Sequence, residues 1–388
     1  MSGERKNAVS YESTRLADYR YDDSIERGPI DLPFAVLALL LLTIGVIMVL
    51  SASFASAYYT MDGNATYYFV RQTLFALCGV GVMFLCSRFP MDFYRRMSMP
   101  VMWVSLGLLL AVIPIGSIGN GSRRWIDLGF TTFQPSELVK IGIILFFAAR
   151  LSRGKDDLST LRGLMPYLAV VGTVAILLLL EPHFSATMII FALAIIMLFL
   201  GGVKLWWFIA GGGAAAALFG IAYVALPYIR DRIAAWLNPF ADPSDTGYQV
   251  VQSLYAIGSG GLLGQGIGNS RQKYLYLPEE HNDYIFSVVC EELGFIGAML
   301  ILVLFALLII RGYWLAMHAR DRYSCLLGAG ITSLIAIQVI LNVCVVTNLL
   351  PSTGNSLPLF SYGGTALLLQ MAEIGIILSL SRDIPEKR

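Results

Sequence analysis

Three carboxylates and a histidine lie directly before a long apolar run, in the stretch RQKYLYLPEEHNDYIF (271–286). Glu279, Glu280 and Asp283 repel one another, which raises the affinity of at least one of them for a proton or a cation. His281 lies among them and titrates near neutral pH. A carboxylate at such a boundary could remove a proton from a substrate hydroxyl, while cations hold a phosphate-linked donor. A proton-coupled transporter for an anionic lipid would explain the same residues nearly as well.

The plain structural role for Asp283 is to cap the helix that follows it. An aspartate in this position satisfies free backbone amides and contributes about 1 kcal/mol. The preceding Asn282 could cap the helix equally well. Capping alone therefore does not explain why ionisable groups gather here.

The composition places these residues in a membrane protein. Of the 388 residues, 57% are hydrophobic and only 14% are charged, whereas a water-soluble domain has about a quarter charged residues. The apolar runs are long and lack the alternation of strands, which excludes an outer-membrane β-barrel. A net charge of +1 gives no attraction to nucleic acid. The five cysteines show no metal-ligand spacing and are expected to pack as small hydrophobic residues.

The apolar runs predict an all-α polytopic membrane protein with ten transmembrane helices. A helix needs about 20 apolar residues to cross the hydrocarbon core. The candidate spans start near Pro33, Tyr68, Met99, Leu138, Met165, Phe184, Leu205, Tyr284, Leu326 and Tyr362. Short or irregular outer loops are expected to surround an outward-facing cavity.

The basic residues predict the orientation of these spans. Of the 27 lysines and arginines, 19 lie in the tails and loops on the side of the termini, and six lie on the opposite side. Because basic residues concentrate in cytoplasmic loops, both termini are predicted to be cytoplasmic. Residues 1–32 are expected to form a disordered tail rather than a signal peptide. The transmembrane domain then covers 33–382, with a long extracellular loop at about 229–283 and a cytoplasmic end at 383–388.

The six basic residues on the outer side cluster in two places. Arg123 and Arg124 stand beside Trp125 in GSRRWIDLGFTTFQPSEL, and a binding role is favoured for them. The other four lie in the long loop and are Arg230, Arg232, Arg271 and Lys273. For the first two of these four, anchoring at lipid headgroups is as good an explanation as binding.

Two outer segments have the features of backbone that lines a cavity. The apolar run from 138 to 149 is short, and Glu137 and Lys140 lie three residues apart on one face of its helix. A structural ion pair and a binding role are equally favoured for this pair. The loop NLLPSTGNSLPLFSYGGTALL carries no charge but contains two prolines and three glycines. Irregular backbone at membrane depth needs a covering of protein or a water-filled cavity, so the two segments predict one shared cavity.

Ionisable residues inside apolar runs mark function by default. Glu291 and Glu292 lie about two turns inside the predicted span that starts near Tyr284. Adjacent helical residues point about 100° apart, so the two glutamates cannot both face one cavity. At least one of them is predicted to be structural. Glu373 has no partner nearby in the sequence and receives no role.

Three stretches resemble the signature loops of the SEDS family, the cell-division, elongation and sporulation proteins FtsW, RodA and SpoVE. The stretches are RRWIDLGF…FQPSELVK, NPFADPSDTGYQVVQSLYAIGSGGLLGQGIGNSRQKYLYLPEEHNDYIFSVVCEELGFIG and LLPSTGNSLPLFSYGGTALL. The resemblance extends from about Pro33 to Arg382. The wording GNSRQKYLYLPE is closer to the FtsW and SpoVE branch than to RodA.

The resemblance implies a peptidoglycan glycosyltransferase that polymerises lipid II at the outer face of the bacterial cytoplasmic membrane. Asp283 matches the essential catalytic residue of the family and is expected to be the base for the 4-hydroxyl of the acceptor sugar. Undecaprenyl diphosphate would be the leaving group. Arg124, Trp125 and Lys140 match family positions that are important for activity. Lys273 is added as a substrate-binding residue for its charge and location, and Glu137, His281, Ser361 and Tyr362 are also expected to bind the substrate.

The resemblance also implies partners. Family members work with a class B penicillin-binding protein that cross-links the new glycan, and this chain would need such a transpeptidase. Other divisome membrane proteins are further candidate partners. A divalent cation, Mg²⁺ or Mn²⁺, could assist the reaction, but the sequence contains no evident metal site. A lipid II flippase and a scaffold that only recruits a transpeptidase are the alternative functions.

Two short stretches depart from the pattern of the family. Many relatives have P-D-[LF]-G-T where this chain has EPHFSAT, so His183 replaces the aspartate and Ser185 the glycine. A histidine could make this turn pH-sensitive. The HTD of many relatives is HND here, and Asn282 keeps a polar side chain that can cap. Asp283 therefore keeps its assignment.

Overall fold

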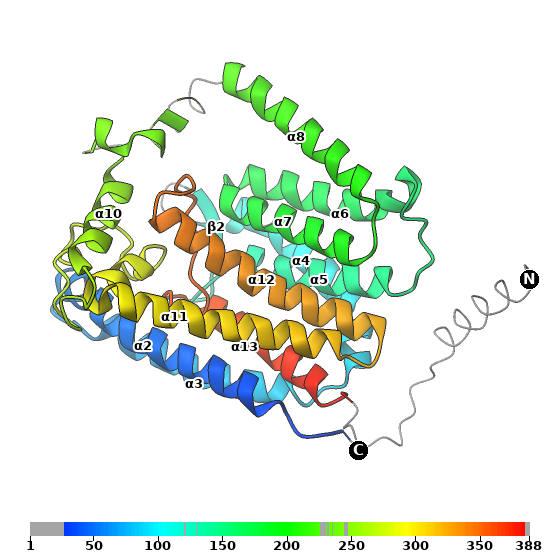
Figure 1. Cartoon of the computed structure of the whole chain (residues 1–388), viewed down its shortest axis with the longest axis horizontal. Helices are drawn as coiled ribbons and strands as arrows, with labels where there is room; N and C mark the ends of the chain where they lie inside the picture. The colour runs from blue at the N-terminus through cyan, green and yellow to red at the C-terminus, as the bar shows by residue number, and fades with distance from the viewer. Residues whose placement is uncertain are drawn as a thin grey trace, which may run out of the picture.

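The computed structural model describes residues 27–384, apart from 120–121, 130, 226–229, 231–232, 235 and 244–246. The predicted disordered tail therefore lies largely outside the described residues, as do Arg232 and residues 385–388. Within the described part, the chain is mostly helical (Figure 1).

Long apolar helices form the body of the protein. In chain order the described α-helices are α2 (Leu32–Thr60), α3 (Tyr67–Cys86), α4 (Met91–Ile115), α5 (Pro135–Leu151), α6 (Leu161–Leu180), α7 (Phe184–Leu200), α8 (Leu205–Ala225), α10 (Tyr248–Gly260), α11 (Ile285–Met317), α12 (Arg322–Val346) and α13 (Gly364–Ser381). Seven of these helices are long and apolar enough to cross a membrane, namely α2, α3, α4, α6, α11, α12 and α13. The chain is therefore a multi-pass membrane protein. Helices α5, α7 and α8 lie where three further spans were predicted.

Two of the long helices start with a capping aspartate, at the end of the bundle where the two ends of the described chain lie. Asp31 accepts a hydrogen bond from Phe34 N at 2.9 Å, with a proline in the first turn of α2. Asp321 accepts one from Ser324 N at 3.2 Å at the start of α12. Beyond these caps the helices consist almost entirely of apolar and small residues, which suits a lipid or protein environment.

A small antiparallel sheet between α4 and α5 was not predicted. Strand β1 (Ser117–Gly119) pairs with β2 (Ser122–Asp127), which pairs with β3 (Thr132–Phe133). The expectation of an entirely helical fold is wrong here. Strands of two to six residues within a polar loop carry too little periodicity to be recognised in a sequence.

The two ends of the described chain meet at one end of the helical bundle. Gly28 N donates to Arg382 O at 2.9 Å, and Arg27 forms an ion pair with Asp383 at 2.8 Å. Figure 1 shows the start of α2 close to the end of α13. An even number of membrane crossings brings chain ends together in this way.

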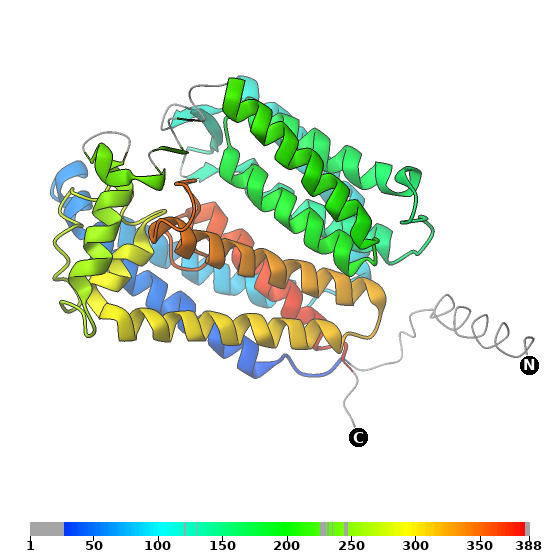
Figure 2. The same cartoon turned by 45° about the horizontal axis from the view of Figure 1, so that its top comes forward.

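Helix α11 changes direction at Gly294. This residue has a φ of +67°, a conformation that residues with a side chain rarely adopt. A Cβ at Gly294 would lie 2.2 Å from Gly264 N, so the backbone of the long loop touches the helix at the bend. Figure 2 shows α10 and this loop, in yellow-green, gathered at one end of the bundle beside the first part of α11.

The bend changes the interpretation of Glu291 and Glu292, which lie before it rather than deep in one straight span. The Glu291 carboxylate accepts hydrogen bonds from Ser270 Oγ at 2.5 Å and from Arg271 N at 2.9 Å. The Glu292 carboxylate accepts one from Ser51 Oγ of α2 at 2.6 Å. Both glutamates therefore have a structural role, because they hold the long loop to the bundle. The sequence had predicted such a role for at least one of them.

Candidate active site

A polar cavity of about 500 Å³ lies where several helices begin. Residues at or beside the first turns of α3, α5, α7, α11 and α13 contribute to its wall, together with β2 and two loops. The free backbone amides at helix N-termini create a positive potential that favours anions. The polar residues of the wall are Arg71, Arg124, Trp125, Asp127, Thr131, Thr132, Gln134, Glu137, Lys140, His183, Ser185, Glu279, Asn282, Asp283, Asn355, Ser356, Tyr362 and Thr365.

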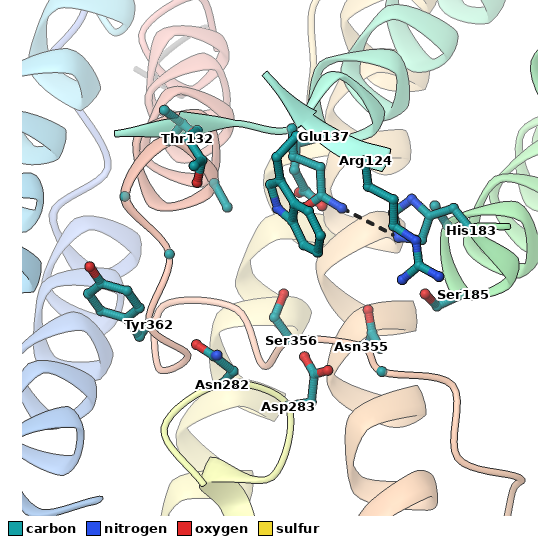
Figure 3. A pocket seen from close by; sticks show the side chains of 18 of the residues that line it. Arg124, Thr132, Glu137, His183, Ser185, Asn282, Asp283, Asn355, Ser356 and Tyr362 are labelled. Atoms are coloured by element: carbon teal, nitrogen blue, oxygen red, sulfur yellow. Dashed lines mark hydrogen bonds between the residues drawn. The ribbon is translucent and has the colours of Figure 1, made fainter. Parts of the chain in front are cut away.

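Because α13 begins at the cavity and ends beside Gly28, the cavity lies at the opposite end of the bundle from the two ends of the described chain. The two segments that were predicted to share a cavity, the start of α5 and the loop before α13, both contribute to its wall. Figure 3 shows their side chains around one space.

Asp283 places its carboxylate in this cavity (Figure 3). It does not cap α11, because the helix begins after Tyr284 without a side-chain hydrogen bond. No hydrogen bond to the carboxylate is found among the described residues, so its oxygens are available to a ligand. The backbone carbonyl of Asp283 accepts a hydrogen bond from Asn342 at 2.8 Å, which fixes the residue to α12.

Burial raises the pKa of Asp283 to about 7, and repulsion from Glu279 adds to this increase. The positive charges of Arg124 and His281 act in the opposite direction. A carboxyl group that is about half ionised near neutral pH is well suited to remove a proton.

Gly354 lies against the Asp283 carboxylate from the loop before α13. Its φ of +65° favours glycine, and a Cβ there would lie 3.0 Å from Asp283 Oδ2. This glycine therefore allows the loop backbone to approach the carboxylate closely.

Arg124 of β2 faces the cavity and is held by the turn between α6 and α7. Its Nη2 donates to Pro182 O at 2.5 Å and its Nε to Glu181 O at 3.4 Å. Burial lowers the pKa of Arg124, whereas the carboxylates of Asp283 and Glu181 raise it. A guanidinium stays protonated in proteins, so Arg124 presents a positive charge to a ligand in the cavity.

Glu137 and Lys140 form an ion pair of 2.7 Å in the first turns of α5. The Lys140 side chain is 2% exposed and the Glu137 side chain is 14% exposed. Both residues also belong to the cavity wall. A structural ion pair and a binding role, which the sequence favoured equally for these two residues, are therefore compatible.

His183 precedes α7 at the cavity wall (Figure 3). Its Nε2 lies 3.4 Å from Gln134 Nε2. Burial lowers the pKa of His183 to about 3, and the charges of Arg124 and Lys140 lower it further. The imidazole is therefore neutral near pH 7. The low pKa argues against the predicted pH sensitivity of this turn near neutral pH, because the site disfavours a third positive charge.

The structure does not bring Lys273 to the cavity. Its side chain is 2% exposed, and its Nζ lies 2.9 Å from Glu292 Oε1 and 3.2 Å from Ser51 Oγ. The expectation of substrate contact rested on charge and location in the sequence, and it does not agree with this buried ion pair. Lys273 instead fastens the long loop to α11 and α2.

His281 and Ser361 lie behind the cavity wall, where substrate contact had been expected. The His281 ring packs on Tyr68 with ring centroids 4.5 Å apart, and its carbonyl accepts a hydrogen bond from Tyr362 N at 2.9 Å. Ser361 Oγ donates to Asn282 O at 2.7 Å. These contacts join the loop that carries Asp283 to the loop before α13. Tyr362, another residue expected to bind the substrate, lines the cavity.

Sequence reasoning did not find Arg71, Gln134 and Asn355 as residues of the cavity wall. Arg71 had a usable signal, because it is a single charge near the start of an apolar run. Gln134 and Asn355 had no signal beyond their place in polar loops. Each of these three reaches the cavity through tertiary contacts.

The candidate divalent cation was considered against the same geometry. Among the described residues, no group of three or more His, Cys, Asp or Glu side chains could hold a metal ion. No step of the reaction is derived through a metal.

The fold and the site define a multi-pass helical membrane protein with a charged cavity at helix N-termini. Residues 31–385 match the family described as cell cycle proteins, which comprises FtsW, RodA and SpoVE. The chain belongs to this family.

Named relatives are similar over nearly their whole length. Stage V sporulation protein E of Bacillus subtilis is 41% identical over 355 residues, which cover 91% of this chain and 97% of the relative. A protein named probable peptidoglycan glycosyltransferase FtsW, from Geobacter sulfurreducens, is 40% identical over 355 residues, which cover 90% of this chain and 95% of the relative.

Solved structures have the same fold. A chain from a peptidoglycan synthase complex, described as coordinating polymerization and crosslinking, has a TM-score of 0.78 at 27% identity and covers 92% of this chain and 99% of its own. The crystal structure of the rod shape determining protein RodA of Thermus thermophilus has a TM-score of 0.68 at 26% identity and covers 92% of this chain and 98% of its own.

Proposed function

We propose that this protein is a peptidoglycan glycosyltransferase that polymerises lipid II into glycan strands during cell division or sporulation. Relatives that are about 40% identical over nine-tenths of the chain carry the name probable peptidoglycan glycosyltransferase FtsW. Within the chain, one observation carries the proposal. The Asp283 carboxylate, free of capping bonds, and the Arg124 guanidinium face one cavity that is surrounded by helix N-termini.

In the proposed reaction, Asp283 removes the proton from the 4-hydroxyl of the acceptor sugar. The hydroxyl oxygen then forms a bond to the anomeric carbon of the donor, and the bond from that carbon to the diphosphate oxygen breaks. The proton remains on Asp283 until water takes it up. A pKa of about 7 supports this role, because the carboxylate is available to accept a proton at neutral pH.

Negative charge develops on the departing undecaprenyl diphosphate. Arg124 and Lys140 are the positive groups of the cavity wall that we assign to this charge. The helix N-termini around the cavity add a positive potential that does not depend on pH. Trp125 and Tyr362 offer aromatic surfaces for sugar rings in the same space.

The ten-span topology belongs to this proposal, with both chain termini in the cytoplasm of a bacterial cytoplasmic membrane. The meeting of the chain ends and the excess of basic residues on their side support it. The cavity then opens at the outer face, where polymerisation would take place.

We also propose that a class B penicillin-binding protein acts as the partner that cross-links the glycan. The similarity to a chain of a peptidoglycan synthase complex supports a partner of this kind. Other divisome membrane proteins are further candidates.

Polymerisation of lipid II by the purified protein tests the proposal, with and without a class B penicillin-binding protein. We expect Asp283→Asn to lower the rate of glycan formation by about 10²- to 10⁴-fold, the usual contribution of a general base. Arg271→Ala is the matched control, because Arg271 is exposed on the same loop and does not line the cavity. Its rate should stay within about twofold of wild type, as for surface substitutions.

Glycan formation at the wild-type rate by Asp283→Asn would refute the assignment of the base. Transbilayer movement of lipid II without any polymer would favour a flippase. A chain that gives neither polymer nor movement, yet binds a transpeptidase, would be a scaffold.

A further inference from the structure

A short loop after α10 packs its backbone directly against α11. Phe295 N donates to Gly261 O at 2.9 Å, and Ile296 N donates to Leu262 O at 3.2 Å. These bonds lie next to the bend at Gly294, where the long loop touches the helix. The loop therefore follows α11 at the point where the helix turns into its long apolar part.

This loop exposes a group of apolar side chains, here called the apolar ridge, which consists of Leu262, Leu263 and Ile267. Their exposed fractions are 69%, 80% and 62%. The segment from Ser259 to Asn269 contains no charged residue. Contiguous exposed apolar groups mark a contact with a membrane or another protein rather than with water.

The apolar ridge continues the surface of a helix that is suited to lipid. Phe295 and Ile296, whose amides bond to the loop, are 60% and 58% exposed, and Leu300 further along α11 is 60% exposed. Helix α11 is one of those that are long and apolar enough to cross a membrane. Because the apolar ridge adjoins the first exposed residues after the bend, it lies at the depth where α11 enters the bilayer.

We propose that the apolar ridge inserts into the acyl-chain region of the outer leaflet and anchors the long loop there. Tyr274 and Tyr276 follow in the loop and are 51% and 58% exposed. Tyrosine is enriched at the level of lipid headgroups, so these side chains mark the surface above the inserted residues. The assignment to the outer leaflet rests on the orientation proposed above. The insertion itself does not depend on the proposed catalytic function.

The anchor has a consequence for the site. Lys273 ties the loop to Glu292 and Ser51, and the chain then runs ten residues further to Asp283. A loop fixed in the leaflet and in the bundle holds the Asp283 carboxylate at a set height above the membrane. A lipid-linked substrate would need its reacting sugar at the same height.

Thiol labelling of the purified protein in liposomes, without any partner, tests the insertion. Leu263→Cys is compared with Arg271→Cys, each in a Cys78→Ser background because the Cys78 thiol is exposed. A charged, water-soluble maleimide is present on both faces of the bilayer. The total amount of reactive thiol is measured separately, after denaturation of the protein in SDS. We expect Leu263→Cys to react at least tenfold more slowly than Arg271→Cys. Ile267→Cys is the second variant and should behave like Leu263→Cys.

A fluorescent label on the same cysteines separates lipid from a protein cover. Liposomes with nitroxide groups on the acyl chains should quench a label at 263 much more strongly than one at 271. Slow reaction without quenching would mean that a protein surface, such as a second copy, covers the apolar ridge, and it would overturn the proposal. If both ridge variants reacted at the rate of Arg271→Cys, the apolar ridge would face water, and this would also overturn the proposal.

Labelling of intact spheroplasts from the outside tests the proposed orientation separately from the insertion. If Arg271→Cys does not react there, the proposed orientation is wrong and so is the assignment to the outer leaflet. Slow labelling and quenching at 263 in liposomes would still support insertion in that case.

Discussion

Lys273 Nζ lies 2.9 Å from Glu292 Oε1, in an ion pair whose side chains are 2% and 0% exposed. Ser51 Oγ of α2 donates to the same carboxylate at 2.6 Å and accepts from Lys273 at 3.2 Å. Helix α2, the long loop and α11 therefore meet at one buried charge pair. The pair holds the loop that leads to Asp283, and this explains a lysine in an otherwise apolar environment.

Removal of one partner of this pair should destabilise the protein. Lys273→Met leaves the Glu292 charge buried without its partner, a loss that costs about 3–5 kcal/mol. We expect a lower unfolding temperature, measured by intrinsic fluorescence in detergent, whereas the exposed control Arg271→Met should unfold like wild type. The double variant Lys273→Met/Glu292→Gln should regain part of the loss, because no unpaired charge remains. An unchanged unfolding temperature in Lys273→Met would contradict the structural role of the pair.

The sequence predicted the parts of the site that follow from local signals. Asp283, Arg124, Trp125, Glu137 and Lys140 were predicted from charged groups at apolar boundaries together with the resemblance to the SEDS loops, and all of them line the cavity. The helix positions followed from apolar length alone. Both kinds of signal lie within about 20 consecutive residues.

The direction of side chains in irregular loops could not be predicted in the same way. His281 is two residues from Asp283, yet it packs on Tyr68 behind the cavity wall. Lys273 has the right charge but points to Glu292. The bend at Gly294 depends on a backbone contact with a glycine thirty positions earlier. Such outcomes are decided by tertiary packing, which a single sequence does not reveal.

The pKa of Asp283 should be visible in the pH dependence of polymerisation. As a base, Asp283 must be ionised, so kcat/KM should rise as the pH increases through about 7. Repulsion from Glu279 contributes to the high pKa, so Glu279→Gln should lower it and move the rising limb to lower pH. Asp127→Asn is the control, since Asp127 lines the cavity but is not among the charges that shift Asp283. If the wild type and Glu279→Gln gave the same rising limb, another group would be the base.

The neutral state of His183 can be tested with two substitutions of different charge. His183→Asn should leave the pH profile between about 5 and 9 unchanged, because a group with a pKa of about 3 is already uncharged throughout this range. His183→Asp adds a negative charge beside Arg124 and Lys140. It should weaken inhibition by inorganic diphosphate by about tenfold, as expected for a charge introduced at short range in a partly buried site. Equal inhibition of the two variants would mean that the anion binds elsewhere in the cavity.

Gly354 should be needed for the position of the Asp283 carboxylate rather than for folding alone. In Gly354→Ala the new Cβ would lie 3.0 Å from Asp283 Oδ2, at a φ of +65°. The left-handed backbone costs about 1–2 kcal/mol in a residue with a Cβ, and relief of the close contact should displace the carboxylate. A displacement of about 1 Å can cost about 10²-fold in rate, so we expect kcat/KM to fall by about ten- to a hundredfold.

The matched control for this prediction is Gly363→Ala, another glycine of the cavity wall. Its φ is 177°, which any residue adopts, and the nearest atom to a Cβ there is Ala366 Cβ at 3.5 Å, an ordinary contact. Gly363→Ala should therefore keep most of its activity. In Gly354→Ala the methyl group should also replace water beside the carboxylate, which disfavours ionisation and moves the rising limb of the pH profile to higher pH. Equal activity and equal pH profiles in the two variants would show that close approach of the loop to Asp283 is not required for the reaction.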